Sequence, residues 1–159
     1  MELKTKMEMK VTSSAFQNEG MIPSKYTDDG SDVSPPLMIE SVPEGTKSLA
    51  LISDDPDAPM GTWIHWVMWN IPADSKELPE AIPTDAKLPD GSIQGMTSFG
   101  RHGYGGPAPP SGTHRFYFKF YALDTKLNLS EKAGKKELLK AMEGHIIAQG
   151  QLMGKYKRK

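Results

Sequence analysis

The run of residues 63–71, WIHWVMWNI, limits the possible folds of this chain more than any other stretch. Aromatic and β-branched residues favour a pleated strand, and both alternating faces of this run are largely apolar. A strand of that kind is buried inside a sheet rather than placed at its edge. Strict alternation puts His65, Val67 and Trp69 on one face. His65, near the start of the strand, is either a satisfied core residue or part of a site.

Other runs predict further strands without a helix between them. Residues 113–124, THRFYFKFYALD, alternate most clearly, and His114 begins an otherwise apolar face that continues through Phe116 and Phe118. Weaker patterns predict strands at residues 6–16, 37–39 and 48–54, with a hairpin-type connection at 42–46. Consecutive strands of this kind pair antiparallel, so the sequence predicts a mostly β, Greek-key β-sandwich.

A long segment after residue 71 has no periodicity and is rich in proline and glycine. Irregular segments of some forty residues inside a compact domain are more often functional than idle. A linker between two domains is the alternative, but the strands on either side are too few to form separate cores. From residue 135 to about 150 the period becomes helical, and Gly150 and Gly154 are expected to end the helix. We therefore predict a single domain over residues 1–159, with a long irregular loop and a C-terminal helix.

Composition excludes several classes of function. The chain has 159 residues, a net charge of −1 and a pI of about 6.4, so no strong field favours nucleic acid or an anionic membrane. The basic residues 155–159 are interpreted as a frayed tail. Cysteine is absent, which excludes disulfides and thiolate zinc sites. No apolar leader and no transmembrane-length run is found, so a cytoplasmic protein without a transmembrane segment is expected.

Two acids and two histidines form the main candidate site. If the two strands that carry His65 and His114 are neighbours, the imidazoles converge at one end of the sheet. Asp55 and Asp57 would then lie above them and could fix the tautomer and charge of a ring. Glycines in residues 105–112 could offer backbone N–H groups to an anion. This arrangement predicts a small cavity for a phosphate or carboxylate group.

The alternative interpretation is that each histidine is simply buried and hydrogen-bonded, as core histidines usually are. The two remaining histidines, His102 in the irregular segment and His145 beside the predicted helix, are interpreted as structural or solvated.

Two motifs carry a resemblance to a known family. The first is DPDAP at residues 55–59, followed by HW at 65–66. The second is GYGGP at 103–107, followed by PPSGTHR at 109–115. Together they resemble the signature regions of the phosphatidylethanolamine-binding protein family, which includes the Raf kinase inhibitor protein and the plant flowering-time regulators. The resemblance extends from about residue 16 to residue 156, and the chain is similar to the bacterial and archaeal branch.

The resemblance implies a β-sandwich with a C-terminal helix and a pocket for phosphate, a carboxylate or a phospholipid headgroup. Carried over position by position, the pocket residues are Asp55, Ala58, Pro59, Trp63, His65, Gly106, Ala108, Pro109, His114 and Phe116, with Asp57 supporting them from behind. Two positions depart from the family pattern. Phe116 stands where tyrosine is common, and Ala108 stands where bacterial relatives often have cysteine. Both changes make the pocket more apolar.

The first functional hypothesis is a ligand-binding or regulatory module, without catalytic residues, cofactor or metal. It would hold a small anion and could inhibit a kinase or a protease. Protonated His65 and His114 would attract the anion, so its affinity should fall as the pH rises. A homodimer is left open, because aromatic sheet faces can associate.

Two other hypotheses use the same residues. A hydrolase would use His65 or His114 as base and Ser98 or Ser111 as nucleophile, although no sequence spacing supports a triad. A metal site would use the two imidazoles and two carboxylates to hold zinc or iron.

Overall fold

The computed structural model describes residues 7–158. Its strands belong to a six-stranded sheet, ordered β1-β9-β8-β4-β5-β7, and a three-stranded sheet, ordered β2-β3-β6. All neighbouring strands pair antiparallel except β1 and β9, which run parallel. In chain order the strands are β1 (Met7–Glu8), β2 (Lys10–Thr12), β3 (Leu37–Glu40), β4 (Ser48–Asp55), β5 (Trp63–Pro72), β6 (Glu77–Leu78), β7 (Ile93–Gln94), β8 (Thr113–Leu123) and β9 (Ile146–Lys157).

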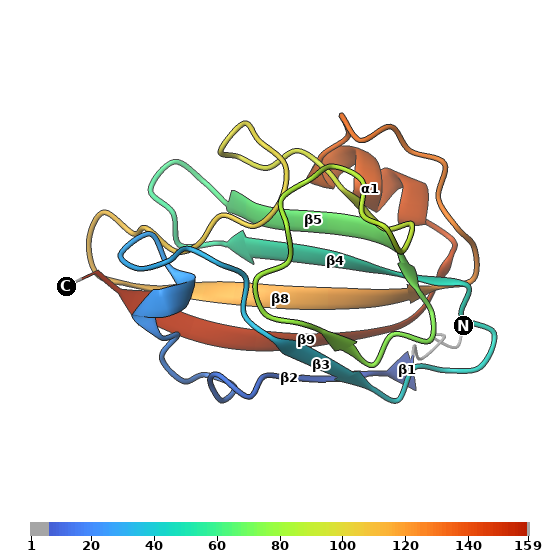
Figure 1. Ribbon diagram of the computed structural model, residues 1–159, viewed down its shortest axis with the longest axis horizontal. Helices are drawn as coiled ribbons and strands as arrows, with labels where there is room; N and C mark the ends of the chain where they lie inside the picture. Colours follow the sequence, from blue (N-terminus) through green and yellow to red (C-terminus); the bar gives the residue numbers. More distant parts are fainter. Residues whose placement is uncertain (1–6, 159) are drawn as a thin grey trace, which may run out of the picture.

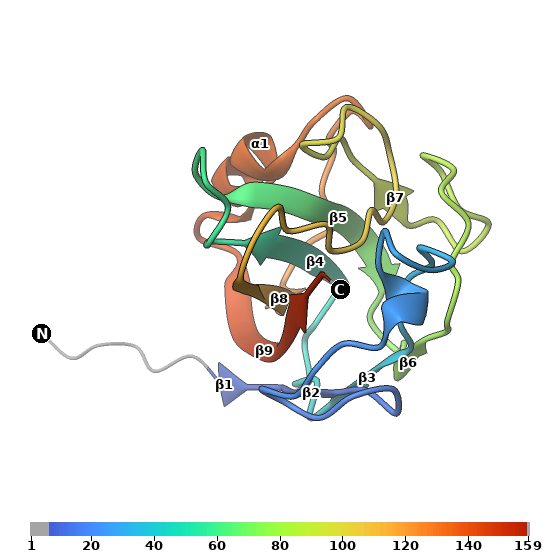
Figure 2. The same ribbon diagram turned by 90° about the vertical axis from the view of Figure 1, so that its left-hand side faces the viewer.

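The large sheet lies between two covering layers (Figures 1 and 2). The small sheet covers one face, and helix α1 (Lys135–Met142) covers the other. The core between the sheets includes Leu51 and Trp66, whereas the core beneath α1 includes Ile52 and Val67. Strands β4 and β5 therefore contribute apolar side chains to both cores. The prediction that residues 63–71 form a buried strand is confirmed.

The chain returns to the centre of the large sheet after a long connection. Strands β4 and β5 form a hairpin, and β8 then lies on the other side of β4. The intervening residues 73–112 contain only the two-residue strands β6 and β7 and are otherwise irregular. A returning connection that brings a strand back beside an earlier one is the feature that defines a Greek key. The predicted fold class, a mostly β Greek-key sandwich with one helix near the C-terminus, is confirmed.

The expected hairpin at residues 42–46 is wrong. Strand β3 pairs with β2 and β6 in the small sheet, whereas β4 pairs with β5 and β8 in the large one. The connection therefore crosses from one layer to the other. The burial patterns agree with this, because β3 alternates between buried and exposed residues and β4 is buried throughout.

The predicted helix is too long. Helix α1 ends at Met142, the chain turns at Gly144 with a φ of 79°, and β9 begins at Ile146. The sequence of β9 alternates with a period of two, but two inward positions are glycines, Gly150 and Gly154, which hid the pattern. Neither glycine ends a helix. Among residues 7–158, no helix is long and apolar enough to cross a membrane.

The basic C-terminal residues are not a frayed tail within the described part of the chain. Lys155 and Lys157 belong to β9, where they pair with Arg115 and Thr113 of β8. Arg158 forms an ion pair with Asp28. The last residue, 159, lies outside the described residues.

The close packing of β9 predicts an effect on stability. A Cβ atom at Gly150 would lie 2.1 Å from the carbonyl oxygen of Met9, so the backbone between β1 and β2 would have to move. We expect Gly150→Ala to lower the free energy of unfolding by about 1–3 kcal/mol, measured by urea denaturation. The exposed neighbour provides the control, because Gln151→Ala should change it by less than about 0.5 kcal/mol. Equal effects of the two substitutions would contradict the role assigned to Gly150.

Candidate functional site

Strand polarity brings both histidines to one end of the large sheet. Strand β4 runs antiparallel to β5 and to β8, so its last residues lie beside the first residues of both neighbours. Asp55 pairs with Trp63 at the start of β5, and Asp54 pairs with Tyr117 of β8. The sequence-based argument supposed that the two histidine-bearing strands are neighbours, but β4 separates them. They converge because β4 ends between them.

A β-bulge turns His65 towards this site. Ser53 of β4 pairs with Trp66, but the next residue, Asp54, pairs with Ile64, which leaves His65 as an extra residue in β5. A bulge of this kind can re-aim a side chain. The ring of His65 contacts Phe116, which belongs to the core between the sheets. Strict alternation would instead have placed His65 with Val67 on the helix-covered face.

The two acids at the end of β4 face opposite sides of the sheet. Asp55 accepts a hydrogen bond from His114 Nδ1 at 2.7 Å, and its other oxygen accepts one from the backbone N–H of Asp57 at 2.8 Å. Asp54 lies on the helix side, where its Oδ2 is 3.0 Å from Lys135 Nζ of α1 and 3.5 Å from Lys119 Nζ. The adjacent carboxylates are thus held by different partners on opposite faces of the sheet.

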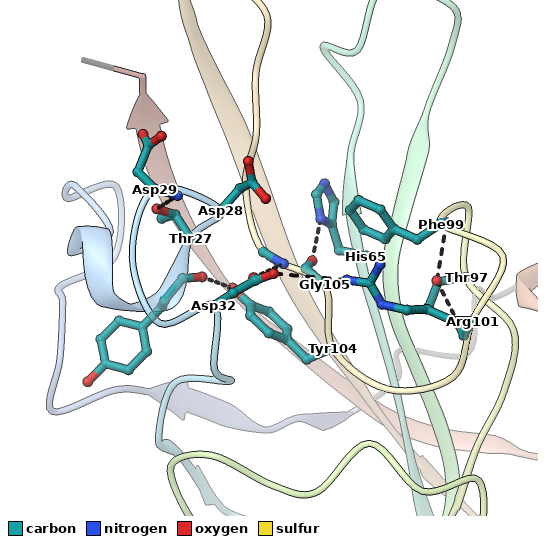
Figure 3. Close-up of polar contacts among 12 residues, drawn as sticks. Thr27, Asp28, Asp29, Asp32, His65, Thr97, Phe99, Arg101, Tyr104 and Gly105 are labelled. Carbon is teal, nitrogen blue, oxygen red and sulfur yellow. Dashed lines mark hydrogen bonds and ion pairs between the residues drawn. The ribbon is translucent and has the colours of Figure 1, made fainter.

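His65 is held by the irregular segment that covers the site. Its Nδ1 lies 2.6 Å from the carbonyl oxygen of Gly105 (Figure 3). A carbonyl only accepts hydrogen bonds, so Nδ1 carries the proton and, in the neutral ring, Nε2 carries the lone pair. Burial lowers the pKa of His65 below its ordinary value. The expectation that a protonated His65 attracts the anion therefore has no support near neutral pH.

These side chains line a cavity of about 240 Å³, which we call the histidine cavity. Three larger hollows lie elsewhere among residues 7–158, but none of them is lined by a histidine. The histidine cavity is lined by Asp55, Ala58, Pro59, Met60, Trp63, His65, Phe99, Ala108, Pro109, Pro110 and His114.

Aromatic contacts hold the walls of the histidine cavity. The ring of Phe99 packs edge-on against Trp63 and His65, with centroid distances of 5.6 and 5.4 Å. The Arg101 guanidinium lies over the ring of Phe99, 4.9 Å from its centroid, and reaches to 3.9 Å from Asp32. Figure 3 shows Phe99 between His65 and the segment that carries Arg101. The wall is therefore an ordered stack rather than a loose loop.

Eight of the eleven residues predicted for the site line the cavity, and Asp57, Gly106 and Phe116 do not. Asp57 binds the side chain and backbone N–H of Arg115. Gly106 packs against the 26–32 segment, where a Cβ atom would lie 2.3 Å from the carbonyl oxygen of Tyr26.

Phe116 lies beside both imidazoles, with its centroid 5.2 Å from that of His65 and 6.3 Å from that of His114. Phe116 therefore supports the cavity from outside.

Three lining residues were missed: Met60, Phe99 and Pro110. Phe99 lies in the irregular segment, where no periodicity indicates which way a side chain points. Met60 and Pro110 adjoin the predicted residues Pro59 and Pro109, so loop proximity was the available signal. Met60 is 96% exposed and Trp63 38%, which gives the cavity an apolar rim.

Among the described residues, the side chains that the hydrolase and metal-site hypotheses require are not arranged for either chemistry. Ser98 Oγ accepts a hydrogen bond from the backbone N–H of Ile64, and neither Ser98 nor Ser111 lines the cavity. Within residues 7–158 no group of three or more histidine or acidic side chains is placed to hold a metal ion. His102 is bonded to the carbonyl of Gln94, and His145 to Asp124.

Comparison with known proteins gives consistent matches. A model of the family described as phosphatidylethanolamine-binding protein matches residues 12–157. The UPF0098 protein of Methanothermobacter thermautotrophicus is 53% identical over 150 residues, which cover 94% of this chain and 99% of that protein. The UPF0098 protein of Aquifex aeolicus is 49% identical, with coverage of 94% and 89%.

Two solved structures share the architecture. A crystal structure from Chlamydia trachomatis, described as that of a phosphatidylethanolamine-binding protein homologue, matches with a TM-score of 0.89 and 41% identity. The structure of Escherichia coli YbcL, described as a new member of the mammalian PEBP family, matches with a TM-score of 0.88 and 34% identity. Each match covers 96% of this chain and 99% of the other.

The contacts of Asp57 predict a pH dependence. Hydrogen bonds from Arg115 lower the pKa of Asp57 to about 2. A lowered folded-state pKa means that this carboxylate stabilises the fold above about pH 4, and that the contribution is lost as the pH falls from about 4 to 2. Arg115→Ala should therefore raise the pKa of Asp57 towards its ordinary value, measured by NMR, and move acid unfolding to a higher pH.

A control variant separates this contact from a change in net charge. Lys126→Ala removes one positive charge from an exposed residue and should leave the pKa of Asp57 unchanged. An Asp57 pKa that is equally low in the Arg115→Ala variant would show that the ion pair is not its cause.

Proposed function

This chain belongs to the phosphatidylethanolamine-binding protein family, and we propose that its histidine cavity binds a small anionic group. The group is a phosphate, a carboxylate or a phosphorylated headgroup. The observation that carries the proposal is that Asp55, His65 and His114, from three different strands, converge on one small cavity.

Both imidazoles have one ring nitrogen free for a ligand. Their Nδ1 atoms are occupied, that of His65 by Gly105 and that of His114 by Asp55. Within residues 7–158, the fully buried side-chain polar atoms without a partner are Asp54 Oδ1 and Trp69 Nε1, so the Nε2 atoms of both histidines are reached by solvent. The two residues are only 4% and 6% exposed and line the histidine cavity, so the opening is into that cavity.

The size and the walls of the cavity favour a small polar group. Ligand pockets for drug-sized molecules have volumes of about 300–1,000 Å³, so a cavity of about 240 Å³ suits a smaller ligand or one group of a larger ligand. Its titratable side chains are Asp55 and the two histidines, whereas proline, alanine and aromatic residues form most of the walls. A group that enters would leave bulk water and meet a few fixed partners, which is the usual basis of specificity.

We assign a binding role rather than turnover. No serine lines the cavity with the histidines, so the histidine–aspartate pair has no hydroxyl nucleophile beside it. The exposed rim, which includes Met60 and Trp63, lies directly beside the bound group. An occupied cavity would thus change the surface offered to a protein target, and this is how an inhibitory or regulatory role towards a kinase or protease would arise.

A calorimetric titration at pH 6 tests the proposed function. Inorganic phosphate, acetate and O-phosphorylethanolamine are titrated into the wild-type protein and into His114→Ala. We expect at least one ligand to bind below the millimolar range, and His114→Ala to weaken it at least about tenfold, since a hydrogen bond to a charged group is worth about 1.5–3 kcal/mol. Circular dichroism checks that the variant is folded.

A histidine outside the cavity, His145, provides a matched control. His145 also bonds to a carboxylate through Nδ1, at 2.7 Å from Asp124, but it lies in the turn after α1 and not in the cavity. His145→Ala should bind as tightly as the wild type. If no ligand binds the wild type, or if the two substitutions weaken binding equally, the histidine cavity is not the anion site.

A further inference from the structure

Resting on the proposed function, we propose that the anion enters the histidine cavity with a proton still attached. The monoanion of a phosphate monoester is the clearest example. Its O–H group would donate a hydrogen bond to Nε2 of His65. The site would then select oxyacids that keep a proton near neutral pH, and it would reject sulfate esters of the same shape and charge.

The Gly105 carbonyl determines which nitrogen of the His65 ring carries the proton. The Gly105 carbonyl, 2.6 Å from Nδ1, needs a donor and cannot itself donate. The neutral ring therefore offers an acceptor at Nε2. In Figure 3 this second ring nitrogen lies on the side of the ring away from Gly105. A ligand atom at this position has to bring the hydrogen.

The surroundings of the ring favour its neutral form. Phe99 and Phe116 pack edge-on against it, with centroid distances of 5.4 and 5.2 Å. The titratable groups that act on the ring are Asp54 and Asp55 of β4, which favour protonation, and His114 of β8, which opposes it. Burial outweighs the two carboxylates and lowers the pKa of His65.

The charge of the lining also disfavours a dianion. The residues that line the cavity include neither lysine nor arginine, and Asp55 is its acidic member. The two nearby guanidinium groups are engaged elsewhere: Arg115 binds Asp57, and Arg101 lies behind Phe99. A fully ionised phosphate would meet the Asp55 carboxylate and the His65 lone pair, and the lining offers it no lysine or arginine. One proton on the ligand removes one negative charge and supplies the donor that His65 needs.

A pair of ligands that differ by one hydrogen tests this directly. Methyl phosphate has its second pKa near 6, so at pH 6 about half of it is the monoanion CH₃OPO₃H⁻. Methyl sulfate is a monoanion of closely similar shape and has no O–H at this pH. By calorimetry at pH 6 we expect methyl phosphate to bind at least about tenfold more tightly, because a buried acceptor left unpaired carries its full desolvation penalty.

The pH profile provides a second readout. Between pH 7 and 8 the affinity of methyl phosphate should fall about tenfold, as its monoanion becomes scarce. That of methyl sulfate should change less, because the ligand does not titrate in this range. A methyl sulfate affinity equal to or greater than that of methyl phosphate at pH 6 would overturn the proposal and leave the proposed function intact. Absence of binding by both ligands would overturn both.

A substitution at His65 tests which atom accepts the hydrogen bond from the ligand. His65→Phe keeps the ring shape and removes Nε2, so the preference for methyl phosphate should shrink to within about threefold. A folded variant that keeps the tenfold preference would overturn the assignment to His65. The comparison of the two ligands in the wild-type protein tests the proton itself, whether or not this variant folds.

Discussion

The histidine cavity depends on one constraint, the position of β4 between two antiparallel neighbours. Because β4 ends where β5 and β8 begin, Asp55 lies between His65 and His114, which are 49 positions apart in the sequence. The hydrogen bond from His114 then ties β8 to this end of β4. The loop that follows β4 and the irregular segment that precedes β8 both join the sheet at this end. The long irregular segment returns the chain to the centre of the large sheet, where β8 forms. Part of the same segment lines the cavity.

The sequence predicted the central strands β4, β5 and β8 and antiparallel pairing, because the alternation of β-branched and aromatic residues shows their periodicity. It failed where glycine replaces an inward side chain, as in β9, and where residues of a strand continue a helical spacing, as Ile146 and Ile147 do. It also found most of the residues that line the cavity, through a family resemblance. The strand argument alone would have placed His65 on the wrong face, since a bulge has no signature in the alternation of a doubly apolar strand.

Phe116 shows how a departure from the family pattern can be accommodated. The sequence-based expectation treated it as a wall residue that lacks a hydroxyl. In the structure its ring lies beside both imidazoles and does not line the cavity, so it shapes the site by packing. An aromatic ring of this kind keeps water from the buried side of His65 and favours its uncharged form. The polarity of the site is therefore set partly by a residue that a ligand would not touch.

The adjacent acids Asp54 and Asp55 have a consequence for the energetics of recognition. One carboxylate is held by a lysine of α1 and the other by an imidazole of β8, so successive residues at the end of β4 are restrained on opposite faces of the sheet. This restraint is established when the protein folds. A molecule that enters later finds the carboxylate and its imidazole already in place, and little conformational entropy remains to be lost on association. Preorganisation of this kind lowers the free-energy cost of binding without adding a single contact to a ligand.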